Sequence, residues 1–243
     1  MIMYDDKLKK ERGYVTKIPF DKRCVVITSG GIDSSVLILK LLEDGYEVFP
    51  LFIDRGQRSI KQEEAAVDLT SGYFGSKYDR YHAAEKVTIS IPLKELKKEL
   101  EPYMKEKGHP MRDPMMHNVA VQYAIVIEQR LGFKIRLIFS GTNLDDPFPH
   151  CTLLGMRASN VCICENTGDW SWQVTSPFID PGFNMMFGKK DILKYGAEKG
   201  FPLEKTRTCY TDNELHCGIC LACTRRKKAF TDAGIKDSTV YLK

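Results

Sequence analysis

The sequence predicts an α/β fold, in which helices flank a parallel β-sheet and a small cysteine-rich unit follows at the C-terminal end. Three observations lead to this prediction. Short apolar runs rich in β-branched residues alternate with amphipathic segments, which is the pattern of βαβ units. Glycine- and aspartate-containing segments directly follow several of these runs. Four cysteines lie close together between residues 209 and 223.

The first βα unit shows the pattern in detail. Residues 25–27 form a β-branched run that stops at residues 28–31, where a buried strand is expected to meet a loop. Ser34 and Ser35 then open the apolar segment 36–42, which ends at Gly45. Serines at the start and a glycine just past the end are typical of a helix.

The remaining elements follow in the same way. The further expected strands are 48–53, 86–91 and 135–139, and the further expected helices are 62–70, 119–131, 189–197 and 224–230. We divide the chain into an N-terminal arm (1–23), an α/β domain (24–200) and a zinc-binding C-terminal subdomain (201–243). The arm has no strong hydrophobic period, so it is expected to be ordered only if another part of the protein covers it.

Three polar segments follow expected strands, namely 29–34, 54–58 and 141–146. Parallel strands end at the same edge of a sheet, and ligands of such sheets bind beyond that edge. The three segments are therefore expected to lie together at one candidate site.

Composition limits the class of protein. The 243 residues, with 43% hydrophobic and 28% charged, are those of a soluble globule with one sizeable core. No apolar stretch reaches the roughly 18 residues of a membrane helix, and residues 1–23 lack a signal-peptide run, so we expect a cytoplasmic protein. The net charge of +4 permits anionic ligands. The basic run 225–228 is expected to be a solvated helix face, because no aromatic stacking surface for nucleic acid accompanies it.

Clustered cysteines in a reducing compartment indicate metal binding. Cys209, Cys217, Cys220 and Cys223 have the spacing C-x7-C-x2-C-x2-C. Four thiolates can enclose one Zn²⁺ tetrahedrally and leave no open position, so this metal is expected to be structural.

The other four cysteines give a weaker pattern. Cys24 opens an apolar run and is expected in the core. Cys162 and Cys164 would share a face if they lay on a strand, and with Cys151 they would form a second thiol cluster. No fourth metal ligand is evident for it.

The segment after the first strand has the features of a phosphate-binding loop. Gly30 and Gly31 allow backbone N–H groups to approach an anion, and the helix after them adds its free N–H groups. Asp33 is assigned to Mg²⁺ or to capping the helix. The Walker and G-x-G-x-x-G patterns are both absent. A simple serine-capped turn is the alternative.

Residues 29–34 resemble the SGGxDS pyrophosphate loop of the N-type ATP pyrophosphatases, which split ATP into AMP and pyrophosphate while adenylating a substrate. A second resemblance rests on five segments, namely 54–58, 209–210, 217–223, 225–230 and 233–241. These segments are similar to the QueC family of 7-cyano-7-deazaguanine (preQ0) synthases.

The resemblance implies a Rossmann-like, HUP-type sheet, a homodimer, and ATP and Mg²⁺ beside structural Zn²⁺. The implied ATP-binding residues are Ser29, Gly30, Gly31, Ile32, Asp33, Ser34, Ser35, Asp54 and Gln57, and the implied catalytic residues are Asp33, Ser34 and Arg58. Enzymes of this family activate the carboxylate of 7-carboxy-7-deazaguanine with ATP. Ammonia then gives an amide, and a second ATP dehydrates the amide to the nitrile.

The implied substrate residues are His117, Asn118, Asp145, Phe148 and His150. Two of them depart from the family pattern, because His117 replaces an arginine and His150 an aspartate. An aspartate is suited to accepting hydrogen bonds from a guanine-like base, so the change at His150 is expected to affect substrate choice. Both histidines also fit ordinary hydrogen-bonded positions, and Asp145 and Asp146 fit either Mg²⁺ binding or a loop cap.

The leading interpretation is a QueC-like ATP-dependent ligase that joins a deazapurine carboxylate to ammonia or another amine. One alternative is a QueC-like enzyme of an anti-phage defence system whose acceptor is a protein amine. A tRNA-modifying pyrophosphatase is a further alternative, but no appended RNA-binding domain accompanies the chain. An alternative of another class is a catalytically idle zinc-knuckle adaptor that binds nucleotide, although the intact loop at 29–34 argues against it.

Overall fold

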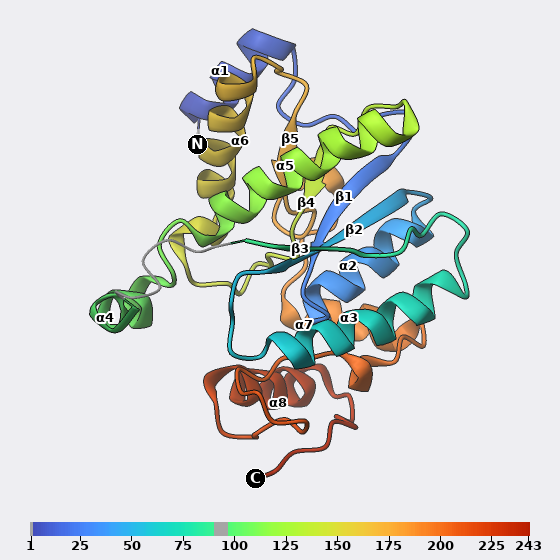
Figure 1. The fold of residues 1–243 in the computed structure, drawn as a ribbon, viewed down its shortest axis with the longest axis vertical. Coiled ribbons are helices and arrows are strands. Elements are labelled where there is room, and N and C mark those ends of the chain that lie inside the picture. The colour runs from blue at the N-terminus through green and yellow to red at the C-terminus, as the bar shows by residue number, and fades with distance from the viewer. Residues whose placement is uncertain (1, 90–96) are drawn as a thin grey trace.

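The computed structural model describes residues 2–89 and 97–243. Its centre is a five-stranded parallel sheet in the order β3-β2-β1-β4-β5 (Figure 1). The strands are β1 (Arg23–Thr28), β2 (Glu47–Asp54), β3 (Glu85–Thr88), β4 (Leu137–Phe139) and β5 (Gln173–Thr175). The four expected strands are present, although residues 90 and 91 of the third lie outside the described residues. The predicted parallel α/β fold is confirmed.

The helices surround this sheet. They are α1 (Ile2–Arg12), α2 (Ile32–Glu43), α3 (Ile60–Gly75), α4 (Lys97–Lys107), α5 (Arg112–Leu131), α6 (Leu153–Thr167), α7 (Lys189–Glu198) and α8 (Leu221–Ala233). The five expected helices correspond to α2, α3, α5, α7 and α8. Helix α5 begins at Arg112 and not at residue 119, so residues expected to precede the helix belong to its first turns.

Two apolar cores lie on the two faces of the sheet. Successive residues of β1 alternate between them: Val26 packs with α2, α7 and α8, whereas Val25 and Ile27 pack with α5 and α6. This alternation is the period of a strand, and burial on both faces explains why β1 reads as a continuous apolar run. Figure 1 shows α5 and α6 on one side of the sheet and α2, α3 and α7 on the other.

Helix α1 occupies the segment that was expected to be an arm. It packs against α6 (Figure 1), where its Leu8 is fully buried. Arg12 at the end of α1 donates to the carbonyl oxygens of Trp170 and Trp172. The segment is ordered because α6 covers it, and its sequence shows no helical stripe because so little of α1 is buried.

The remaining cysteines do not form the second thiol cluster. Cys162 and Cys164 lie on α6 and not on a strand, so one is exposed and the other buried. In the described part of the chain, no potential metal-ligating group includes either of them. Within the same residues, no helix is both long and apolar enough to span a membrane.

Candidate active site

The phosphate-loop candidate lies between β1 and α2, as expected. Gly30 adopts φ +66°, and a Cβ at this position would lie 2.7 Å from the Ala66 Cβ and 2.8 Å from the Val67 amide nitrogen. Only glycine fits such a left-handed, crowded position. The loop is thus held tightly against α3, and its next residue, Gly31, is the N-cap of α2.

This crowding predicts a large effect of Gly30→Ala. We expect a loss of unfolding free energy of at least about 2 kcal/mol, because the alanine adds backbone strain and a clash with α3. Gly56→Ala is the matched control: Gly56 has φ +73°, but none of the described residues lies within 4 Å of an added Cβ. It should lose only about 1 kcal/mol from strain. Equal losses in denaturant titrations would contradict the tight contact.

Asp33 lies in the first turn of α2 and forms an ion pair with Lys189, the first residue of α7. The expected capping role is wrong, since Gly31 is the N-cap and has no side chain to cap with. Although the second carboxylate oxygen, Oδ1, is buried, it has no hydrogen-bond partner among the described residues. That oxygen remains available to a ligand.

The third polar segment, residues 141–146, also lies beside the start of α2. A Cβ on Gly141 would lie 2.8 Å from the amide nitrogen of Ser34, so the loop after β4 touches the start of α2. Burial and the Asp33 carboxylate raise the pKa of Asp146 above its ordinary value. Asp145 instead accepts a hydrogen bond from the Lys189 amide at 2.7 Å, at the start of α7. Of the two alternatives for Asp145, the geometry matches a capping role and not Mg²⁺ binding.

The second polar segment, residues 54–58, forms hydrogen bonds mainly within itself and with α3. The Gly56 amide donates to Asp54 at 2.8 Å, and Gln57 bridges the Arg55 amide (2.9 Å) and Glu63 (2.8 Å). The side chain of Arg58 is 71% exposed and reaches away to Asp212 at 3.4 Å. The catalytic role expected for Arg58 stays a prediction.

His117 and Asn118 do not converge on one point. Consecutive helical residues point in directions about 100° apart, and in α5 His117 is buried whereas Asn118 is exposed. His117 Nδ1 lies 3.1 Å from Ser159 Oγ, and burial lowers the pKa of His117 to about 4. This histidine is neutral in the folded protein at physiological pH.

His150 lies in a compact polar group at the start of α5. Its ring stacks on Phe148 with centroids 5.6 Å apart, and its Nε2 accepts a hydrogen bond from Arg112 at 3.2 Å. Arg112 also donates to Asp113 at 2.7 Å. Asp113 is 4% exposed, and although burial opposes its ionisation, Arg112 holds its pKa below the ordinary value. Sequence reasoning missed Arg112, Asp113 and Lys189, because only contacts across the fold give them a role.

The four cysteines of the C-terminal knuckle, Cys209, Cys217, Cys220 and Cys223, converge as expected. Two sulfur pairs, 217–223 and 209–220, lie 3.9 and 4.0 Å apart. Burial would raise the pKa of the Cys209 thiol, but N–H groups of Cys217 and Thr211 donate to its sulfur and lower the pKa to about 6. The four sulfurs lie close enough together to hold one tetrahedral metal ion, which binds cysteine as the thiolate.

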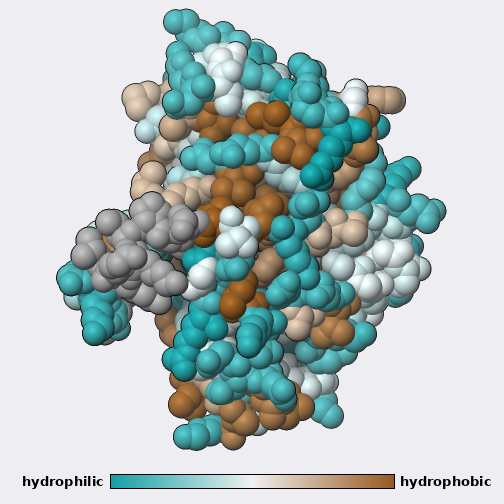
Figure 2. Space-filling model, in the orientation of Figure 1, coloured by the Kyte–Doolittle hydropathy of each residue, from teal (hydrophilic) through white to brown (hydrophobic). Residues whose placement is uncertain are grey.

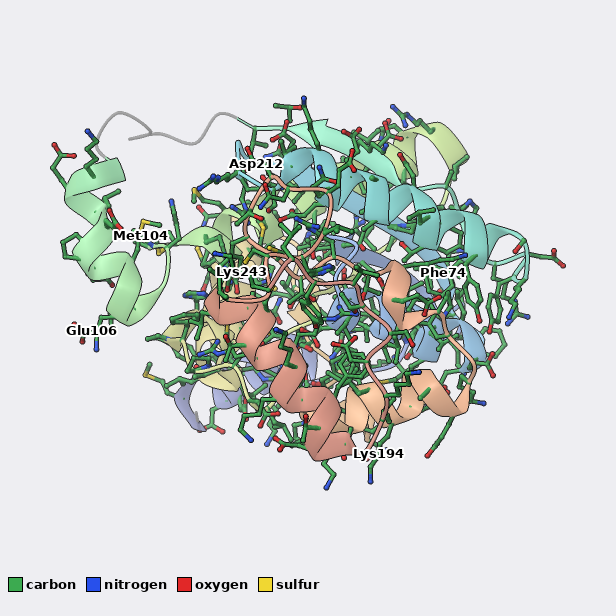
Figure 3. All side chains as sticks on the ribbon, turned by 90° about the horizontal axis from the view of Figure 1, so that it is seen from below. Phe74, Met104, Glu106, Lys194, Asp212 and Lys243 are labelled. Carbon is green, nitrogen blue, oxygen red and sulfur yellow. The ribbon has the colours of Figure 1, made fainter. Side chains whose placement is uncertain are left out.

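The knuckle also contacts the phosphate loop. The amide of Arg207 donates to the Gly30 carbonyl at 2.8 Å, and its guanidinium donates to the carbonyl oxygens of Thr211, Asn213 and Glu214. Figure 3 shows the loop that carries Asp212 beside α3, where Gln62 donates to the Asp212 carbonyl at 3.1 Å. The four-cysteine unit therefore supports the loop that is expected to bind phosphate.

The parallel sheet, the glycine loop at the start of α2 and the four-cysteine knuckle define a class: a Rossmann-like α/β protein with a phosphate-loop motif. Comparison with known proteins gives the family. The model of "Queuosine biosynthesis protein QueC" matches residues 23–234. The chain therefore belongs to the QueC family.

Individual relatives agree with this assignment. The 7-cyano-7-deazaguanine synthase of Acetivibrio thermocellus is 33% identical, over 91% of this chain and 98% of its own. The 7-cyano-7-deazaguanine synthase 2 of Desulfitobacterium hafniense is 30% identical, over 91% and 94%. Among solved structures, a 4-thiouridine synthetase bound to RNA and ATP is 16% identical, with a TM-score of 0.47 over 88% of this chain and 50% of that one.

Proposed function

We propose that this protein is an ATP-dependent ligase that adenylates the carboxylate of a 7-deazaguanine-type acid and releases pyrophosphate. The activated acyl group then passes to ammonia, which gives the amide and, with a second ATP, the nitrile. Membership of the QueC family carries the proposal, together with the glycine loop of residues 29–34 at the carboxyl edge of the sheet. Relatives named 7-cyano-7-deazaguanine synthase support the product.

The loop residues have a defined part in this chemistry. Backbone N–H groups around Gly30 and Gly31, with the start of α2, would hold the phosphates of ATP. Burial and the Asp33 carboxylate raise the pKa of Asp146, and a bound cation would offset this repulsion, so we assign both carboxylates to Mg²⁺. The metal ion supplies charge neutralisation of the phosphates. Lys189 balances Asp33 until that ion binds. Zn²⁺ is assigned to the knuckle, as a structural ion.

The test is ATP turnover to AMP and pyrophosphate with 7-carboxy-7-deazaguanine, with and without ammonium, followed by mass spectrometry. Formation of the amide or nitrile supports the proposal. Turnover without either product would favour a different acceptor, such as a protein amine in a defence system. The expectation behind this second candidate is the departure at His150, whose side chain contacts Arg112 in this structure. Absence of any acid-dependent turnover would favour the idle adaptor.

His150→Asp tests the expected role of His150 in substrate choice. We expect the selectivity, measured as kcat/KM, to shift towards 7-carboxy-7-deazaguanine by about 10-fold or more, because a carboxylate accepts hydrogen bonds from a guanine-like edge. His109→Asp is the matched control, since His109 lies near the same group but bonds the Pro110 carbonyl at 3.0 Å. An unchanged substrate profile in His150→Asp would contradict a role for His150 in substrate choice.

A homodimer is also part of the proposal. Large hydrophobic side chains of the knuckle are exposed, among them Ile219 (65%), Val240 (62%) and Leu221 (56%). Figure 2 shows hydrophobic surface at the lower end of the molecule, where Figure 1 places the C-terminal unit. Burying such a patch against a second copy would stabilise a dimer. A mass of 27.7 kDa by light scattering, that of one chain, would contradict it.

A further inference from the structure

Three potential metal ligands meet at the start of α5, away from the knuckle. Asp113 comes from the first turn of that helix, and His150 and Cys151 come from the short 3₁₀ helix Pro149–Cys151. Their ligand atoms all lie within 4.8 Å of one another. Asp113 and Cys151 are buried, and His150 is mostly buried. The expected thiol cluster failed for Cys151, but the fold gives this cysteine two other partners.

The spacing of these atoms fits a tetrahedral ion. His150 Nε2 lies 3.7 Å from Asp113 Oδ2, and Cys151 Sγ lies 3.6 Å from the same oxygen. Zinc bonds of about 2.0–2.3 Å at tetrahedral angles place N, O and S ligands about 3.3–3.6 Å apart. The two distances to Asp113 Oδ2 are thus within a few tenths of an ångström of that spacing. The third pair, His150 and Cys151, lies within 4.8 Å.

The hydrogen bonds of this group leave a nitrogen of His150 and an oxygen of Asp113 able to bind a metal ion. A guanidinium only donates, so the contact of Arg112 with His150 Nε2 means that this nitrogen carries a lone pair. Arg112 donates from its Nε to Asp113 Oδ1, which leaves Oδ2 facing the other two ligands. A partner on the outer oxygen of a ligating carboxylate is usual in metal sites. The ion would replace one hydrogen bond, from Arg112 to His150, and the proton of the Cys151 thiol.

The charge of the surroundings also suits a cation. The positive guanidinium of Arg112 opposes a metal ion, but Asp113 and a deprotonated Cys151 each supply a negative charge. Asp146 adds another, since its charge acts on both Arg112 and Cys151. Asp146 in turn feels the charge of Asp33, so the group borders the candidate phosphate site.

We propose that Asp113, His150 and Cys151 bind one divalent transition-metal ion, for which zinc is the best match. The site is separate from the knuckle. Three protein ligands with a fourth position left for water or a substrate oxygen are the arrangement of catalytic rather than structural zinc. A carboxylate or carbonyl oxygen is the class of ligand that this fourth position would take.

The experiment is a metal count on the full chain, purified without chelator, equilibrated with zinc and desalted. We expect about two equivalents per chain by mass spectrometry of the metals, one in each site. Asp113→Asn keeps the shape of the side chain and should leave about one equivalent. His150→Ala and Cys151→Ser should do the same. His109→Ala and Cys162→Ser are the matched controls and should keep both, since Cys162 is an exposed thiol on α6.

Cobalt substitution separates the two sites without any change of sequence. Loading the metal-free protein with Co²⁺ should give two sets of absorption bands, one from four thiolates and one from a single thiolate with nitrogen and oxygen. Only the second set should disappear in Asp113→Asn. A single equivalent of zinc in the unaltered protein, or two that persist in Asp113→Asn, would overturn the proposal. Neither readout uses turnover, so a failure of the proposed ligase activity leaves this test unaffected.

Discussion

Asp33→Ala should abolish ATP turnover while the protein remains folded. The Asp33 carboxylate stands at the start of α2 with one buried oxygen free, and Lys189 and Asp146 are its charged neighbours. If Asp33 positions Mg²⁺ on the phosphates, its removal takes away charge stabilisation where charge develops. Loss of one such group costs about 10²–10³ in rate. Release of AMP and pyrophosphate measures the effect, and circular dichroism checks the fold.

Two further variants separate the effect of the Asp33 charge from effects of side-chain shape and of surface charge in general. Asp33→Asn keeps the shape of the side chain and should show a similar loss, because charge is what the ion requires. Asp68→Ala removes an exposed carboxylate of α3 that pairs with Lys86, and it should turn over ATP normally. Normal turnover in Asp33→Ala would remove Asp33 from the site. A loss in Asp68→Ala of equal size would point to a general effect of surface charge.

Much of the fold was predictable because its signals are local. The βα unit around Gly30 combines a β-branched run, a glycine turn and a serine-rich helix start, all within twenty residues or so of chain. Helix α6 and strand β5 carry no such signal. Arg157 and Asn160 of α6 are buried polar residues that break the apolar stripe. Their partners include Asp180 and the Trp172 carbonyl, which lie outside α6.

The residues of the candidate site also fall into those that a local pattern predicts and those that only the fold brings together. Motif residues that are expected to bind phosphate through the backbone, such as Gly30 and Gly31, are found by pattern. Asp113 was not found, because its role depends on η2, the 3₁₀ helix of residues 149–151, which is brought against α5 by the fold. Arg58 was found by its motif, and its side chain pairs with Asp212 of the knuckle. Its role at the site stays a prediction.

Cys217→Ser should release the metal ion of the knuckle and destabilise the protein. Cys217 contributes one of four sulfurs and accepts the Cys220 amide at 3.3 Å, so serine leaves an incomplete ligand set. Apparent binding free energies of structural zinc sites reach about 10–16 kcal/mol in small peptides, and losing the ion should cost several kcal/mol here. Metal content should fall by one equivalent, and thermal unfolding should move to lower temperature.

The same variant should also weaken ATP binding, although no cysteine is expected to touch the nucleotide. The knuckle holds Arg207, whose amide supports the Gly30 carbonyl at 2.8 Å, and a loosened knuckle would release that contact. Calorimetric titration of ATP measures this effect. Cys162→Ser, on the exposed face of α6, should retain metal, stability and ATP affinity. Full metal retention in Cys217→Ser would contradict the metal site. Loss of the metal with unchanged ATP affinity would show instead that the phosphate loop is held by α3 alone.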